Sequence, residues 1–63
     1  MILDELQKQF EIKNDRQLAI KLGVDAPTIS RVRTGKAKVS AELMIAIHKT
    51  FGLSIADIEE MAK

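Results

Sequence analysis

Residues 16–35, RQLAIKLGVDAPTISRVRTG, set the architecture of this chain of 63 residues. The apolar residues of the first half recur at helical spacing: Leu18, Ala19 and Leu22. This spacing predicts a short amphipathic helix over about residues 15–22. Gly23 ends the helix where a residue with positive φ is needed, because glycine has no Cβ to oppose that conformation. Asn14 is a suitable N-cap, and Gln17 follows three residues later to reach back to it.

A second short helix is predicted over about residues 26–33. Asp25 can cap it by accepting a backbone N–H, and Pro27 suits its first turn, where no intrahelical donor is needed. Its inner face consists of two apolar residues spaced at i and i+3: Ile29 and Val32. Two helices this short, joined by about three residues, must cross steeply because they lack a long shared face. The stretch therefore predicts a helix-turn-helix over about residues 15–34.

Matches to a known pattern run through the same residues. They read LA..LGV...TISR...G between Leu18 and Gly35, and they continue downstream as GKAKVS.E and FGLS. On these residues the chain resembles the phage-repressor-like, Cro/CI-type helix-turn-helix family, over about residues 14–58. The resemblance implies an all-α, five-helix lambda-repressor-like domain that acts as a sequence-specific transcriptional regulator, in the first place a repressor. Helix-turn-helix folds also serve as protein-binding modules, so the fold by itself leaves that alternative open.

Three further helices complete the predicted fold. Apolar residues at helical spacing and acids in the first turn predict one over about residues 2–12. Ser40 can cap another that ends at Gly52, and Ser54 can cap the last. We expect a single domain over residues 1–63, because a chain this short buries only about 60% of its unfolded surface and favours helices with local contacts.

The expected core is mostly aliphatic, since the chain has only two aromatic residues. Its expected members are Leu6, Phe10, Leu18, Ala19, Leu22, Val24, Ile29, Val32, Val39, Leu43, Ile47, Phe51 and Ile58. Five further apolar residues exceed what so small a core needs, and partial burial of some of them is the equally open alternative: Met44, Ile45, Leu53, Ile55 and Met61. They fall in the last two predicted helices and their junction. We therefore expect weak homodimerisation through Leu53, Ile55 or Met61, strengthened on DNA.

Charge is segregated along the chain. Residues 13–38 carry seven Lys or Arg against two Asp, a formal charge of +5, whereas residues 1–12 and 39–63 each carry −2. The basic third contains the helix-turn-helix and the loop after it, as expected of a surface that meets nucleic-acid phosphates. Double-stranded DNA is therefore the expected partner.

The outer face of the helix over residues 26–33 is the expected reading element. Its outward residues are small except for two arginines, which suits a helix that enters the major groove. The resemblance implies base-facing positions at Pro27, Ser30 and Arg31, and Arg31 is the best candidate for a bidentate contact to guanine. Residues expected to contact the DNA backbone are Arg16, Thr28, Arg33, Thr34, Lys36 and Lys38.

Two acidic residues depart from the family pattern. Asp15 stands where many relatives carry Gln, and Asp25 where they carry Ser or Thr. Both suit a helix start, yet both place negative charge near the expected DNA backbone. Either the affinity per site is modest, or one of them orients an arginine. The residues at positions 26 and 27 lack hydrogen-bonding side chains, which leaves specificity to Ser30, Arg31 and the shape of the DNA.

Catalysis and metal binding find no support in the sequence. His48 is the only histidine and there is no cysteine, so we expect no enzyme activity, cofactor, metal site or disulfide. No apolar run approaches the ~20 residues that span a bilayer, and a soluble, cytoplasmic protein without a membrane partner is expected. Met1, directly before a predicted helix, is interpreted as a natural start, which leaves a whole small protein and an N-terminal domain equally open.

The alternative function is a protein-interaction module, such as an antitoxin or an adaptor. Its partner surface would centre on apolar residues of the last two helices: Met44, Leu53, Ile55 and Met61. A basic reading helix favours DNA, whereas exposure of those four residues would favour a protein partner. The operator, the regulated genes and any inducer lie beyond what the sequence predicts.

Overall fold

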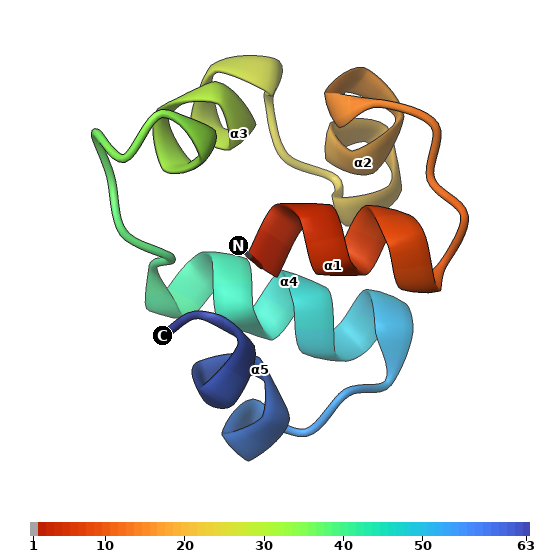
Figure 1. Cartoon of the computed structure of the whole chain (residues 1–63), viewed down its shortest axis with the longest axis vertical. Helices are drawn as coiled ribbons and strands as arrows, with labels where there is room; N and C mark the ends of the chain where they lie inside the picture. Colours follow the sequence, from red (N-terminus) through yellow and green to blue (C-terminus); the bar gives the residue numbers. More distant parts are fainter. Residues whose placement is uncertain (1) are drawn as a thin grey trace.

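The computed structural model describes residues 2–63, so Met1 and its interpretation as a natural start lie outside the described residues. The described residues form five helices and no strand (Figure 1): α1 (Ile2–Gln9), α2 (Asp15–Leu22), α3 (Ala26–Arg33), α4 (Ala41–Phe51) and α5 (Ile55–Met61). The predicted all-α, five-helix fold is confirmed. α2 packs against α3 and α4, while α5 packs against α4 and α1. The helix-turn-helix, formed by α2 and α3, therefore lies at the opposite end of the molecule from α5 (Figure 1).

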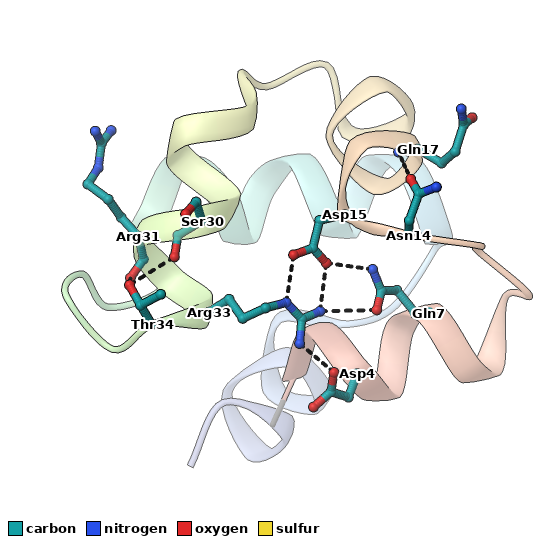
Figure 2. Close-up of polar contacts among 9 residues, drawn as sticks. All are labelled: Asp4, Gln7, Asn14, Asp15, Gln17, Ser30, Arg31, Arg33 and Thr34. Atoms are coloured by element: carbon teal, nitrogen blue, oxygen red, sulfur yellow. Dashed lines mark hydrogen bonds and ion pairs between the residues drawn. The ribbon is translucent and has the colours of Figure 1, made fainter.

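Side-chain caps begin four of the helices, at the predicted residues. Asn14, Asp25, Ser40 and Ser54 each accept a hydrogen bond from the backbone N–H three residues later, at 2.9 to 3.2 Å. Each cap satisfies a donor that the first turn of a helix leaves without an intrahelical partner. The Gln17 side chain does not reach back to Asn14 as expected, since Figure 2 shows it pointing away from that residue.

α1 ends before the predicted boundary near residue 12. Glu11 adopts a left-handed conformation with φ 56°, and the N–H of Ile12 donates to the carbonyl of Gln7 at 2.8 Å. This pattern closes the end of a helix and is usually built around glycine, so the sequence carries no signal for it here. Beyond α1 the chain turns toward α2, and the Phe10 ring stacks on Phe51 with ring centroids 4.3 Å apart.

All five helices contribute to one hydrophobic core. Its buried members are Ile2, Leu3, Leu6, Leu18, Ala19, Leu22, Ile29, Val32, Leu43, Ile47 and Ile58. The prediction was wrong at its edges: Phe10, Val24, Val39 and Phe51 are only partly buried against this cluster. Ile2 and Leu3 were missing from the expected core, and they are buried because α1 packs against α5.

The surplus apolar residues divide into two groups. Ile45 and Ile55 are 48% and 39% exposed, whereas Met44, Leu53 and Met61 pack partly against the core. Ile20, on the outer side of α2, is 63% exposed, which the sequence does not predict. Some of the five surplus residues are thus partly buried, one of the two outcomes expected from the sequence, and the exposed apolar surface of the last two helices centres on Ile45 and Ile55.

Gly23 ends α2 with φ 73° and ψ 28°, the left-handed conformation that the sequence predicts. Nothing lies within 4 Å of the place where a Cβ would stand, so only the backbone conformation opposes a side chain there. We expect Gly23→Ala to lower the free energy of unfolding by about 1 kcal/mol and the β-branched Gly23→Val by about 1–3 kcal/mol. Urea denaturation measures both losses.

Gly23→Asn is the matched control, because asparagine tolerates the left-handed region better than other residues with a side chain. Its loss should be smaller than that of Gly23→Ala. Equal stability of the Val and Asn variants would contradict this explanation of the turn.

Candidate nucleic-acid interface

α3 has a buried face and an exposed face. Ile29 is fully buried and Val32 is 6% exposed, and these two side chains anchor the helix on the core. The opposite face consists of exposed residues at positions i, i+3, i+4 and i+7: Pro27, Ser30, Arg31 and Thr34. All three residues predicted to face DNA bases therefore share one exposed face of α3. Figure 2 shows the Arg31 side chain extending away from the rest of the protein.

The two threonines predicted to contact phosphates use their hydroxyls within the protein. The Thr28 hydroxyl and the Thr28 N–H both donate to the Asp25 carboxylate, which caps α3. The Thr34 hydroxyl donates to the carbonyl of Ser30 at 3.0 Å. Because a phosphate accepts hydrogen bonds, either threonine must exchange its present bond before its hydroxyl can donate to DNA.

Exposed cations flank α3 on two sides. Arg16 is the second residue of α2, while Lys36 and Lys38 lie in the loop that leads to α4. The loop stays close to the end of α3, because the N–H groups of Lys36 and Ala37 both donate to the carbonyl of Arg31, at 2.9 and 3.1 Å. Within residues 2–63 no ion pair occupies Arg16, Lys36 or Lys38, so their charges are available to an external anion.

Arg33 lies elsewhere than the sequence predicts. Its guanidinium donates to both oxygens of the Asp15 carboxylate at 2.7 Å, to Asp4 at 2.6 Å and to Gln7 at 3.0 Å (Figure 2). Gln7 also donates to Asp15 at 2.8 Å. We call these four residues the Arg33 cluster.

The sequence predicts Arg33 among the outward residues of this helix, but its side chain is only partly exposed, and the helical period explains the difference. Arg33 follows the buried Ile29 by four residues, so its side chain leaves α3 on the side that faces α1 and α2. Asp15 therefore orients an arginine. This was one of the two alternatives that the sequence left open for the acids near the expected DNA backbone. Asp4 and Gln7 were missed, because only the packing of α1 brings them near α3.

The hydrogen bonds of the Arg33 cluster hold the pKa of Asp15 below its usual range, with the Arg33 guanidinium as the main cause. The carboxylates in turn raise the pKa of Arg33. Asp25 also has a lowered pKa, because the side chain and the N–H of Thr28 donate to it. The charged form of each group is therefore the one that the fold favours.

A pH-dependent contribution to stability follows from Asp15. Its folded pKa is lower than the unfolded value of about 3.9, so the contribution is present above pH 4 and is lost as the pH falls toward the folded value. The Asp15 side chain is 40% exposed, so screening limits the contribution to about 0.2–1 kcal/mol. Unfolding free energies of the wild type and of Asp15→Asn should differ by a constant amount between pH 5 and 7 and converge below pH 4.

The groups that face Asp15 are the Arg33 guanidinium and the Gln7 amide, and Asp4 accepts a hydrogen bond from the same guanidinium. The same comparison in an Arg33→Met background is therefore the control. In that background, the effect of Asp15→Asn on the free energy of unfolding should lose most of its pH dependence. A pH dependence that persists without Arg33 would contradict the assignment.

Metal sites and membrane-spanning helices have little support in the described part of the chain. Residues 2–63 contain no group of three metal-ligating side chains and no helix long and apolar enough to cross a membrane. The His48 ring lies 2.5 Å from the carbonyl of Leu53, where it links α4 to the turn that follows. Met44 and Met61 line a groove of about 560 Å³ beside the loop after α3.

Comparison with models of known protein families gives a match. The model of the bacteriophage CI repressor helix-turn-helix domain matches residues 2–59, which include α1 to α4, the exposed face of α3 and the flanking cations. No curated protein and no solved structure matches the chain.

Proposed function

The chain belongs to the bacteriophage CI repressor helix-turn-helix family, a family of DNA-binding regulators, and we propose that it is a sequence-specific repressor that inserts α3 into the major groove. The exposed face of α3 carries the proposal. It combines small residues with one long, unpaired donor, Arg31, between flanking cations. A helix with its side chains is about 10–12 Å wide and the groove about 12 Å, so small residues favour close approach.

Arg31 is the proposed base-reading residue. A guanidinium donates two parallel hydrogen bonds, which match the O6 and N7 acceptors of guanine in the major groove. Pro27 and Ser30 share its face and allow the helix to approach the base edges. The Ser30 hydroxyl can donate or accept, so it adds contact with little discrimination by itself.

The DNA backbone is the proposed partner of the flanking cations. Arg16 would bind the strand beside α2, while Lys36 and Lys38 would bind phosphates beside the end of α3. Thr28 and Thr34 join this set only if they exchange the bonds that they now make. Arg33 is left out of the proposed contacts, because its donors are engaged with Asp15, Asp4 and Gln7.

Two copies on one operator complete the proposal. A single α3 reads about half a site, and half-sites in related complexes lie one helical turn, about 34 Å, apart. Ile55 is the most accessible of the three residues predicted at the interface, since Leu53 and Met61 pack partly against the core. We infer weak association in solution that strengthens on DNA, in the cytoplasm where a repressor meets its operator.

Selection of bound duplexes from a random pool, at near-physiological salt, tests the function. We expect enrichment of inverted repeats with half-sites one turn apart, with two protein chains bound per duplex. The salt concentration must be held fixed, because the affinity for phosphates changes steeply with it. Enrichment of single half-sites with one chain bound would contradict the dimer, and no enrichment at all would favour the protein-interaction module.

A further inference from the structure

We propose that Asp15 withholds Arg33 from the DNA backbone, so that the protein binds any duplex with one phosphate contact fewer than its cations would allow. Asp15 would thus act through Arg33 as a positioning residue, with Asp4 and Gln7 in support. The inference rests on the proposed DNA-binding function. It adds that the helix-turn-helix itself limits the affinity of the protein for duplex DNA.

The geometry of the Arg33 cluster retains the guanidinium firmly. A guanidinium has five N–H donors, and Arg33 makes four hydrogen bonds of 2.6 to 3.0 Å within the protein. Two of them form a fork on the Asp15 carboxylate, the arrangement that binds carboxylates most strongly. A phosphate would have to displace Asp15 to obtain the same fork.

The Arg33 cluster lies where a DNA phosphate could compete with Asp15 for the Arg33 guanidinium. Asp15 and Arg16 are the first two residues of α2, so the Arg33 guanidinium lies beside a residue proposed to contact the flanking strand. The side chains of Arg33 and Asp15 are 30% and 40% exposed, which leaves the pair accessible to a phosphate. Arg33 faces two carboxylates, so the Arg33 cluster carries a formal charge of −1, whereas Arg33 alone would contribute +1.

Loss of the Asp15 charge should release Arg33. Nonspecific binding depends on the number of phosphates that a protein neutralises, so it should rise when another arginine becomes available. We expect Asp15→Asn to increase the affinity for a random-sequence duplex about 3- to 10-fold near 0.1 M salt. The slope of log affinity against log salt should steepen by about one unit.

A double-mutant cycle separates release of Arg33 from the simple loss of a negative charge. Affinity for the random duplex and its salt slope are measured for the wild type, Asp15→Asn, Arg33→Gln and the double variant. If Arg33 mediates the effect, most of the gain from Asp15→Asn disappears in the Arg33→Gln background. Equal gains in both backgrounds, or no gain in either, would overturn the inference.

Two further variants serve as a second test and as a charge control. Arg33→Lys keeps the net charge but cannot form the two-bond fork on Asp15, so it should also raise the affinity for the random duplex. No change or a decrease in that affinity would overturn the inference. This test remains available if Asp15→Asn fails to fold. Asp57→Asn removes an exposed acid from α5 and should leave the salt slope nearly unchanged. If the wild type binds no duplex, the proposed function itself is contradicted. If the wild type binds but Asp15→Asn has the same effect with and without Arg33, only the withholding of Arg33 is contradicted.

Discussion

Arg31→Ala should weaken binding to the preferred duplex about 5- to 150-fold, equivalent to about 1–3 kcal/mol, and weaken binding to random duplexes much less. The physical reason is that two hydrogen bonds to a guanine edge form only at the correct base pair. Arg31 is exposed and forms no ion pair within the described chain, so the substitution would remove the proposed DNA contact without breaking an ion pair of the fold. Preference at one base pair of the selected site should relax.

Lys36→Ala is the matched control on the same basic surface. Lys36 lies in the loop that is hydrogen-bonded to the end of α3, where it would neutralise a phosphate of any sequence. Its loss should weaken preferred and random duplexes by similar factors and reduce the salt slope by roughly one unit. The ratio of the two affinities, measured at one salt concentration, therefore separates the roles of the two residues.

An unchanged affinity ratio for Arg31→Ala would remove Arg31 as the base-reading residue. If both variants also leave the absolute affinities unchanged, α3 is not the surface that meets DNA. The protein-interaction module would then become the better explanation of the fold.

Ile29→Ala should lower the free energy of unfolding by about 2–5 kcal/mol, because Ile29 is fully buried where α3 joins the core. Removing three carbons there costs both burial of apolar surface and the cavity that remains. A native domain is typically stable by only about 5–15 kcal/mol, and a chain of this length falls at the low end. The variant should therefore keep only a small part of the free energy of unfolding of the wild type.

Ile20→Ala is the matched control, since it makes the same chemical change at a residue that is 63% exposed. We expect a change within about 0.5 kcal/mol, as for most surface substitutions. Urea denaturation of both variants, followed by circular dichroism, measures the difference. A loss for Ile20→Ala comparable to that for Ile29→Ala would show that Ile20 is covered in solution, for example by a second copy.

The starts of four of the five helices, α2 to α5, could be predicted from residues within one turn of each cap. Asn14, Asp25, Ser40 and Ser54 act on N–H groups three residues away, so the interaction needs no information from the rest of the chain. Gly23 likewise marks the end of α2 through its own backbone conformation. The exposed face of α3 was predictable for the same reason, because helical period alone places Pro27 and Arg31 on one side.

The environment of Arg33 depends instead on how three helices pack. Its partners Asp4, Gln7 and Asp15 lie between 18 and 29 residues away in the chain, and no local pattern joins them. A charged residue beside an apolar inner face could equally have projected into solvent. Whether its charge is free or already paired is set by the distance between α1, α2 and α3, which only the folded arrangement of the core determines.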